Sequence, residues 1–63
     1  MTVEQVIEMA KKGELSVRGV ERLSPSKRLI VAANSLDPVI LARLKRQVKY
    51  LAEHPDLVSQ LKH

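Results

Sequence analysis

Residues 37 to 53 carry the longest coherent pattern in the chain, DPVILARLKRQVKYLAE. Aliphatic residues recur there at spacings of three, four and three, which places them in one stripe along an α-helix. The stripe consists of Leu41, Leu44, Val48 and Leu51, widened by Ile40. Asp37 suits an N-cap and Pro38 the first helical position, and Pro55 predicts that the helix ends near His54. The pattern predicts a single amphipathic helix over residues 37–53 with a buried apolar side.

The opposite side of this helix is cationic, because its basic residues fall outside the apolar stripe. Eight basic residues lie between Ser16 and Ala52, and only Glu21 and Asp37 oppose them. They are Arg18, Arg22, Lys27, Arg28, Arg43, Lys45, Arg46 and Lys49. The remaining acidic residues gather towards the two ends of the chain. A basic segment between acidic flanks favours a polyanionic partner or an acidic protein surface, and a merely solubilising face is the alternative.

Length and composition set the class of protein. The 63 residues predict one small domain spanning 1–63. The chain has no cysteine, which excludes disulfides and thiolate metal sites and is compatible with a cytoplasmic location. No stretch approaches the roughly 20 apolar residues of a membrane span, and the first residues do not resemble a signal peptide. With no Phe or Trp, the core must be aliphatic, so self-association is one way to gain buried area.

Three shorter helices are predicted before residue 37. The first spans about 3–12, with Thr2 and Gln5 forming a capping box and Gly13 ending it. The second spans about 17–23, begins after Ser16 and contains Gly19. The third runs from residue 25 or 26 to 34 or 35. Val31 and Ala32 make it apolar nearly all round, which predicts the central, most buried helix. Its expected buried side consists of Leu29, Ile30, Ala33 and Leu36.

Beyond Pro55, three apolar residues can add one or two helical turns that fold back on the other helices. They are Leu57, Val58 and Leu61. The last two residues are expected to fray. The fold class predicted is therefore all-α, a compact bundle of four short helices with a possible fifth C-terminal turn or helix.

The N-terminal half resembles a helix-turn-helix unit from Ala10 to Leu23, AKKGELSVRGVERL. A small residue at Ala10 and apolar residues at Leu15, Val20 and Leu23 match the usual spacing of that motif. The resemblance implies that Ser16 starts a recognition helix whose N-terminus approaches DNA. The residues then expected to point outward are Val17, Arg18, Glu21 and Arg22. Gly13 departs from the motif, because it precedes the usual turn glycine by one place. An ordinary helical hairpin with the same apolar spacing is the alternative.

The inventory of reactive groups predicts a non-enzymatic protein without metal or cofactor. The only histidines, His54 and His63, belong to no metal-ligand spacing. The chain also has no cysteine nucleophile, glycine-rich phosphate loop or ordered Ser-His-acid set.

The hypothesis that follows is a small regulatory protein that binds nucleic acid, duplex DNA foremost, through basic helix faces. Arg18 and Arg22 are expected to approach the grooves. The expected phosphate contacts are Lys27, Arg28, Arg43, Lys45, Arg46 and Lys49. The alternative is an adaptor or inhibitor that docks its basic helical face on an acidic protein surface. The apolar stripe has two interpretations. It could form the interface of a homodimer, or it could belong to the core of the monomer.

Overall fold

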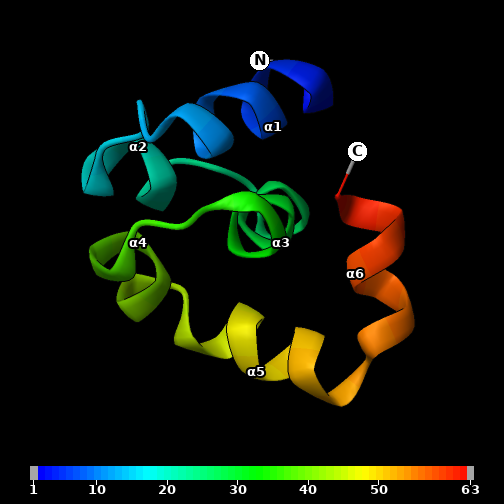
Figure 1. Cartoon of the computed structure of the whole chain (residues 1–63). Coiled ribbons are helices and arrows are strands. Elements are labelled where there is room, and N and C mark those ends of the chain that lie inside the picture. Colours follow the sequence, from blue (N-terminus) through cyan, green and yellow to red (C-terminus); the bar gives the residue numbers. More distant parts are fainter. Residues whose placement is uncertain (1, 63) are drawn as a thin grey trace.

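The computed structural model describes residues 2–62, and this part of the chain consists of helices and connecting turns without a β-strand (Figure 1). The helices are α1 (Val3–Lys12), α2 (Val17–Glu21), α3 (Pro25–Asn34), α4 (Pro38–Arg43), α5 (Lys45–Glu53) and α6 (Pro55–Leu61). The predicted all-α class is confirmed, and the expected C-terminal turn is a helix of seven residues. His63, whose fraying was predicted, lies outside the described residues.

The helix starts follow the capping residues in the sequence. The Thr2 hydroxyl accepts from the Gln5 amide at 3.2 Å, and the Gln5 side chain accepts from the Thr2 amide at 3.0 Å. The Ser16 hydroxyl accepts from the Gly19 amide at 3.0 Å, and one Asp37 carboxylate oxygen accepts from the Val39 amide at 2.9 Å. Each bond satisfies an amide that has no partner within its own helix. The predicted capping box and both N-caps are confirmed.

Helix α3 lies at the centre, seen nearly end-on in Figure 1, with α1 on one side, α5 on the opposite side and α6 beside it. It contacts α1, α2, α5 and α6. Its buried residues are Ile30, Val31, Ala33 and Asn34. Because α3 meets neighbours on nearly every side, the prediction that it is the central helix is confirmed.

The predicted helix over residues 37–53 is not continuous, and this part of the sequence prediction is wrong. The chain bends at Leu44 (φ −102°, ψ 34°), whose amide donates to the carbonyls of both Ile40 and Leu41 at 3.1 Å. A straight helix over residues 38–53 would be about 24 Å long, nearly the 26 Å longest dimension of the protein. The bend instead lets α4 pack against α2 while α5 packs against α3.

The bend also divides the apolar stripe. Leu44 and Leu51 are buried at 2% and 7% exposure, as predicted, and Ile40 joins them. Leu41 is only partly buried and Val48 is 39% exposed, so their assignment to the core is wrong. Both side chains instead line an open hollow with Ala32 and Ala33 of α3.

Leu36 is a second correction, because it is 88% exposed instead of buried beneath the third helix. Helix α3 ends at Asn34, and Ser35 is extended (φ −77°, ψ 141°). The helical period that would bring Leu36 to the buried face therefore stops two residues before it. Leu29, predicted buried, is partly buried.

The apolar anchors of the helix-turn-helix resemblance belong to the core. Ala10 and Val20 are buried, and Leu15 and Leu23 pack against the same cluster partly buried. Val17 packs there as well, so its expected outward position is wrong. Helix α2 has five residues and ends at Glu21, two residues short of its predicted end.

Candidate nucleic-acid interface

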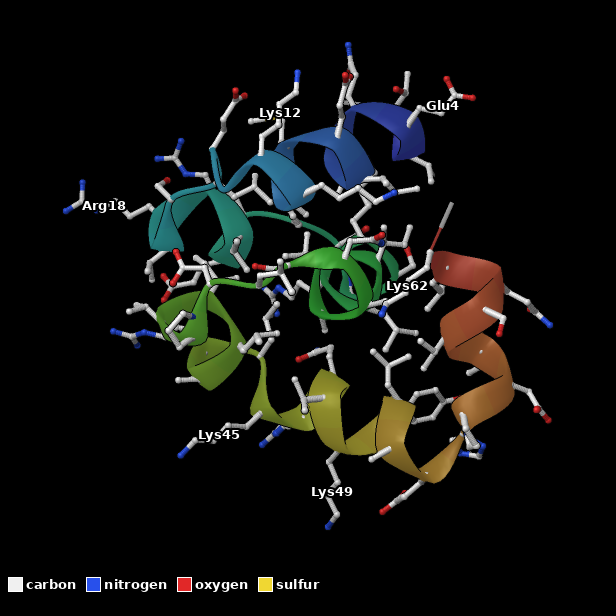
Figure 2. All side chains as sticks on the ribbon, viewed as in Figure 1. Glu4, Lys12, Arg18, Lys45, Lys49 and Lys62 are labelled. Carbon is white, nitrogen blue, oxygen red and sulfur yellow. The ribbon has the colours of Figure 1, made fainter. Side chains whose placement is uncertain are left out.

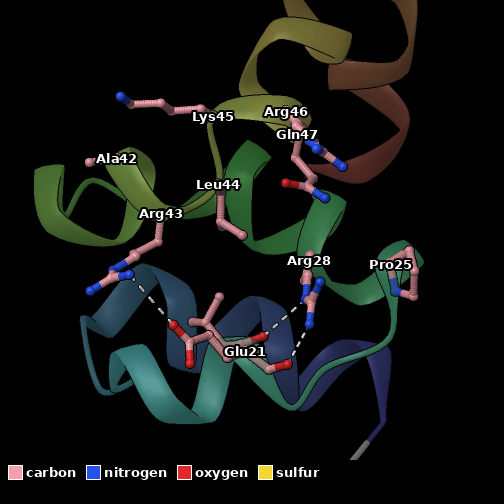
Figure 3. Close-up of a pocket in the computed structure, with 10 residues that line it drawn as sticks. Glu21, Pro25, Arg28, Ala42, Arg43, Leu44, Lys45, Arg46 and Gln47 are labelled. Carbon is pink, nitrogen blue, oxygen red and sulfur yellow. Dashed lines mark hydrogen bonds and ion pairs between the residues drawn. The ribbon is translucent and has the colours of Figure 1, made fainter.

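A groove of about 570 Å³ opens where α2, the start of α3 and the bend between α4 and α5 meet (Figure 3). It is lined by Val20, Glu21, Pro25, Arg28, Ala42, Arg43, Leu44, Lys45, Arg46 and Gln47. Four of these residues are basic and one is acidic, so the lining carries a net formal charge of +3 (four minus one). We call this the basic groove. The bend between α4 and α5 forms one wall of this groove. The groove therefore depends on a bend that the sequence does not predict.

Arg28 is the most firmly held cation of the basic groove. Its Nε donates to the Val20 carbonyl at 3.4 Å, and its Nη2 donates to the Glu21 carbonyl (Figure 3). The last carbonyls of a helix have no partner within it, and the C-terminal end of its dipole favours a cation. Arg28 thus caps the end of α2 and fastens it to α3, while its guanidinium remains in the lining of the groove.

Arg43 approaches the single carboxylate of the basic groove. Its Nη1 lies 3.8 Å from Glu21 Oε1, and the two side chains are 63% and 56% exposed. Ion pairs this exposed contribute about 0–1 kcal/mol, because water and salt screen them. The pair is therefore weak enough to exchange its carboxylate for an anionic ligand.

Helix α5 begins in the lining of the basic groove. Lys45, Arg46 and Gln47 form its first turn, which has neither an acidic residue nor a side-chain cap. The amides of a first helical turn point towards the solvent and favour anions. The two cationic side chains and this helix end therefore add to the same positive potential. Lys45 projects outward from this end of α5 (Figure 2).

The structure gathers half of the eight predicted contact residues in the basic groove. Those four are Arg28, Arg43, Lys45 and Arg46. Arg18 and Arg22 are exposed at α2 but do not line the groove, and Arg18 projects away from the protein (Figure 2). Lys27 is partly buried in α3, and Lys49 is exposed on α5 and points outward. The eight residues therefore form one groove and a more scattered outer set.

Two residues of the groove, Glu21 and Gln47, are not among the predicted contact residues. Glu21, predicted to point outward from a recognition helix, is exposed, and its carboxylate also pairs with Arg43. Gln47 is not among the predicted contact residues, although it lines the groove together with Arg43. Glu21 is one of only two acidic residues between Ser16 and Ala52, so the sequence marks it as a candidate partner for the basic residues there. No signal in the sequence distinguished Gln47, because its position depends on the bend.

Other kinds of site find little support in the described residues. Within residues 2–62, no group of three or more His, Asp or Glu side chains is placed to hold a metal ion. None of the helices described is both long enough and apolar enough to cross a membrane. Comparison with known protein families, curated proteins and solved structures gives no match to this chain.

Proposed function

We propose that this protein is a small non-enzymatic regulator that binds nucleic acid, with the basic groove contacting backbone phosphates. The observation that carries the proposal is that four cationic residues from α3, α4 and α5 line one groove with a single carboxylate. Phosphate contacts of this kind supply most of the sequence-independent affinity of nucleic-acid-binding proteins. The scattered cations outside the groove extend the positive field and steer a polyanion towards it.

Each groove cation has a different part in this proposal. Arg28 is fixed by the two carbonyls of α2 and so presents a preorganised charge. Arg43 exchanges Glu21 for a phosphate oxygen, at small cost because the pair is exposed. Lys45 and Arg46 extend the contact along α5 towards the exposed Lys49. The guanidinium groups can each bind phosphate in a bidentate manner, whereas the ammonium groups act as point charges.

Duplex DNA is the form that the sequence predicts. Helix α2 has five residues, which gives a length of about 7.5 Å, or less than two turns. A helix this short can reach few base edges in a groove of DNA. It is better suited to contact the phosphate backbone of the DNA. Duplex DNA is therefore proposed as a ligand held mainly through its phosphates.

The test is a titration of a fluorescently labelled duplex at several salt concentrations. Binding through phosphates predicts that log affinity falls linearly with log salt, with a slope of about −0.9 per phosphate contacted. Arg46→Gln is expected to weaken binding and to reduce the slope by about one contact.

The matched control is Lys12→Gln, which also removes one cation, but from α1, where Lys12 pairs with Glu8 at 3.3 Å. Both variants should keep the helical circular dichroism of the original protein. Absence of binding at low salt, or equal weakening by the two substitutions, would contradict the proposal.

A second candidate function, docking on another protein, is favoured by a separate observation. Leu36 and Val39 are 88% and 59% exposed around the link between α3 and α4. Exposed apolar side chains of this size are frequent at protein interfaces. In this alternative the partner is an acidic protein surface or a second copy of the chain. Sedimentation equilibrium of the original protein and of Leu36→Asp tests the second copy, which requires a concentration-dependent dimer that the substitution abolishes.

A further inference from the structure

The basic groove continues into a less polar hollow of about 390 Å³ between the start of α3 and the middle of α5. The hollow is lined by Pro25, Ser26, Leu29, Arg46, Gln47 and Tyr50. Three of these residues, Pro25, Arg46 and Gln47, also line the basic groove, so the two spaces adjoin. One half of the combined surface is cationic and the other offers an aromatic ring and aliphatic groups.

Tyr50 is the only aromatic residue of the hollow and is placed for contact with a planar ligand. It follows Arg46 by four residues on α5, so the two side chains are neighbours on one helical face. Tyr50 is 45% exposed. Its ring lies 4.5 Å from the His54 ring, centroid to centroid, at an angle of 42°. The histidine therefore restrains the ring from one direction, while the hollow leaves part of its surface open.

From this juxtaposition we infer that the site takes an unpaired nucleotide, with its phosphate at Arg46 and its base on Tyr50. The inference rests on the proposed nucleic-acid binding and names the form of the ligand. A nucleotide joins an anionic group to a planar ring, and the combined surface offers a complement to each. In a fully paired duplex the base faces are covered by their neighbours in the stack, so Tyr50 cannot reach them. Single-stranded DNA or RNA is therefore the preferred class.

Electrostatics alone predicts the opposite preference. A duplex carries a higher charge density than a single strand and releases more counterions for each phosphate neutralised. A single strand gains instead from base stacking on an aromatic side chain, and loss of one such contact weakens binding on the order of ten-fold. Preference for the single strand thus distinguishes stacking at Tyr50 from attraction of phosphates to the groove.

The experiment compares three labelled probes with the same number of phosphates in the labelled strand. They are a single-stranded DNA 12-mer, the same 12-mer paired to its complement, and a 12-mer of abasic sites. We expect the single strand to bind more tightly than either other probe, on the order of ten-fold against the abasic strand. Tyr50→Leu should lose that advantage and leave abasic binding unchanged. Tyr50→Phe keeps the ring and should bind like the original protein.

The possible failures are distinguishable. Equal binding of the three probes, or tighter binding of the duplex, overturns the inference, and a steep salt dependence would then still support the proposed function. Failure of all probes to bind at low salt overturns both. If Tyr50→Leu loses helical circular dichroism, the comparison of the intact with the abasic strand on the original protein still decides the inference.

Discussion

Leu44→Ala and Val48→Ala form a matched test of the structure, because the two residues share one apolar stripe in the sequence but differ in burial. Leu44 is 2% exposed and belongs to the main core cluster, whereas Val48 is 39% exposed beside an open groove between α3, α5 and α6. A continuous helix over residues 37–53 would bury both side chains against the same surface. The bend at Leu44 makes their contributions to stability unequal.

The expected magnitudes follow from the groups removed. Truncating Leu44 loses the transfer free energy of its buried carbons, at about 0.8 kcal/mol for each, and leaves a cavity, so it should cost about 2–5 kcal/mol. Val48→Ala removes two methyl groups that are about three-fifths buried, which is worth about 1 kcal/mol. The higher helix propensity of alanine recovers part of this, up to about 0.7 kcal/mol. Val48→Ala should therefore cost roughly 0.5 kcal/mol.

The assay is urea denaturation together with thermal melting, both followed by circular dichroism at the helical band. A chain of this length has a total stability of about 3–9 kcal/mol, so Leu44→Ala should be largely unfolded or should melt at least about 10 °C lower. Val48→Ala should differ from the original protein by only a few degrees. Equal losses in the two variants, or a larger loss for Val48→Ala, would refute the division of the stripe.

Three further predictions concern individual contacts. Gly13→Ala should destabilise the protein by about 1–2 kcal/mol in the same assay, because Gly13 has φ 71° and a side chain is strained in the left-handed region; an unchanged midpoint would contradict this conformation. Asn34→Asp should lower the free energy of unfolding by several kcal/mol at neutral pH. The buried Asn34 amide nitrogen donates to the carbonyls of Ile30 at 2.8 Å and Leu61 at 2.9 Å, and a carboxylate there would be buried without a donor. Asn34→Leu, which buries no charge, is the control and should melt well above Asn34→Asp. Glu21→Gln should strengthen duplex binding several-fold at low salt, because it frees Arg43 from an exposed ion pair. It should change the free energy of unfolding by less than about 1 kcal/mol. Weaker binding would show that Glu21 positions Arg43 for the ligand.

Local signals in the sequence determined the helices themselves. Capping residues at Thr2, Ser16 and Asp37 and the left-handed Gly13 act within a few residues of the chain, so their effect does not depend on the rest of the fold. The central position of α3 also followed from sequence, because a helix that is apolar nearly all round must be enclosed. The four cations of the basic groove were among the eight predicted, since charge excludes such side chains from the core.

The tertiary structure alone decided how those pieces combine into a site. Residues 38–53 form two helices because α4 packs against α2 while α5 packs against α3. The spacing of apolar residues within 38–53 does not indicate where α2 and α3 lie. The bend at Leu44 turns the stripe, exposes Val48 and brings Arg43 towards Glu21 from a different helix. Amphipathic spacing therefore specified which side of each helix is mainly apolar and which is cationic, but not which apolar side chains are fully buried. Packing between helices specified which of them meet, because the free energy of burial depends on surfaces that are distant in the chain.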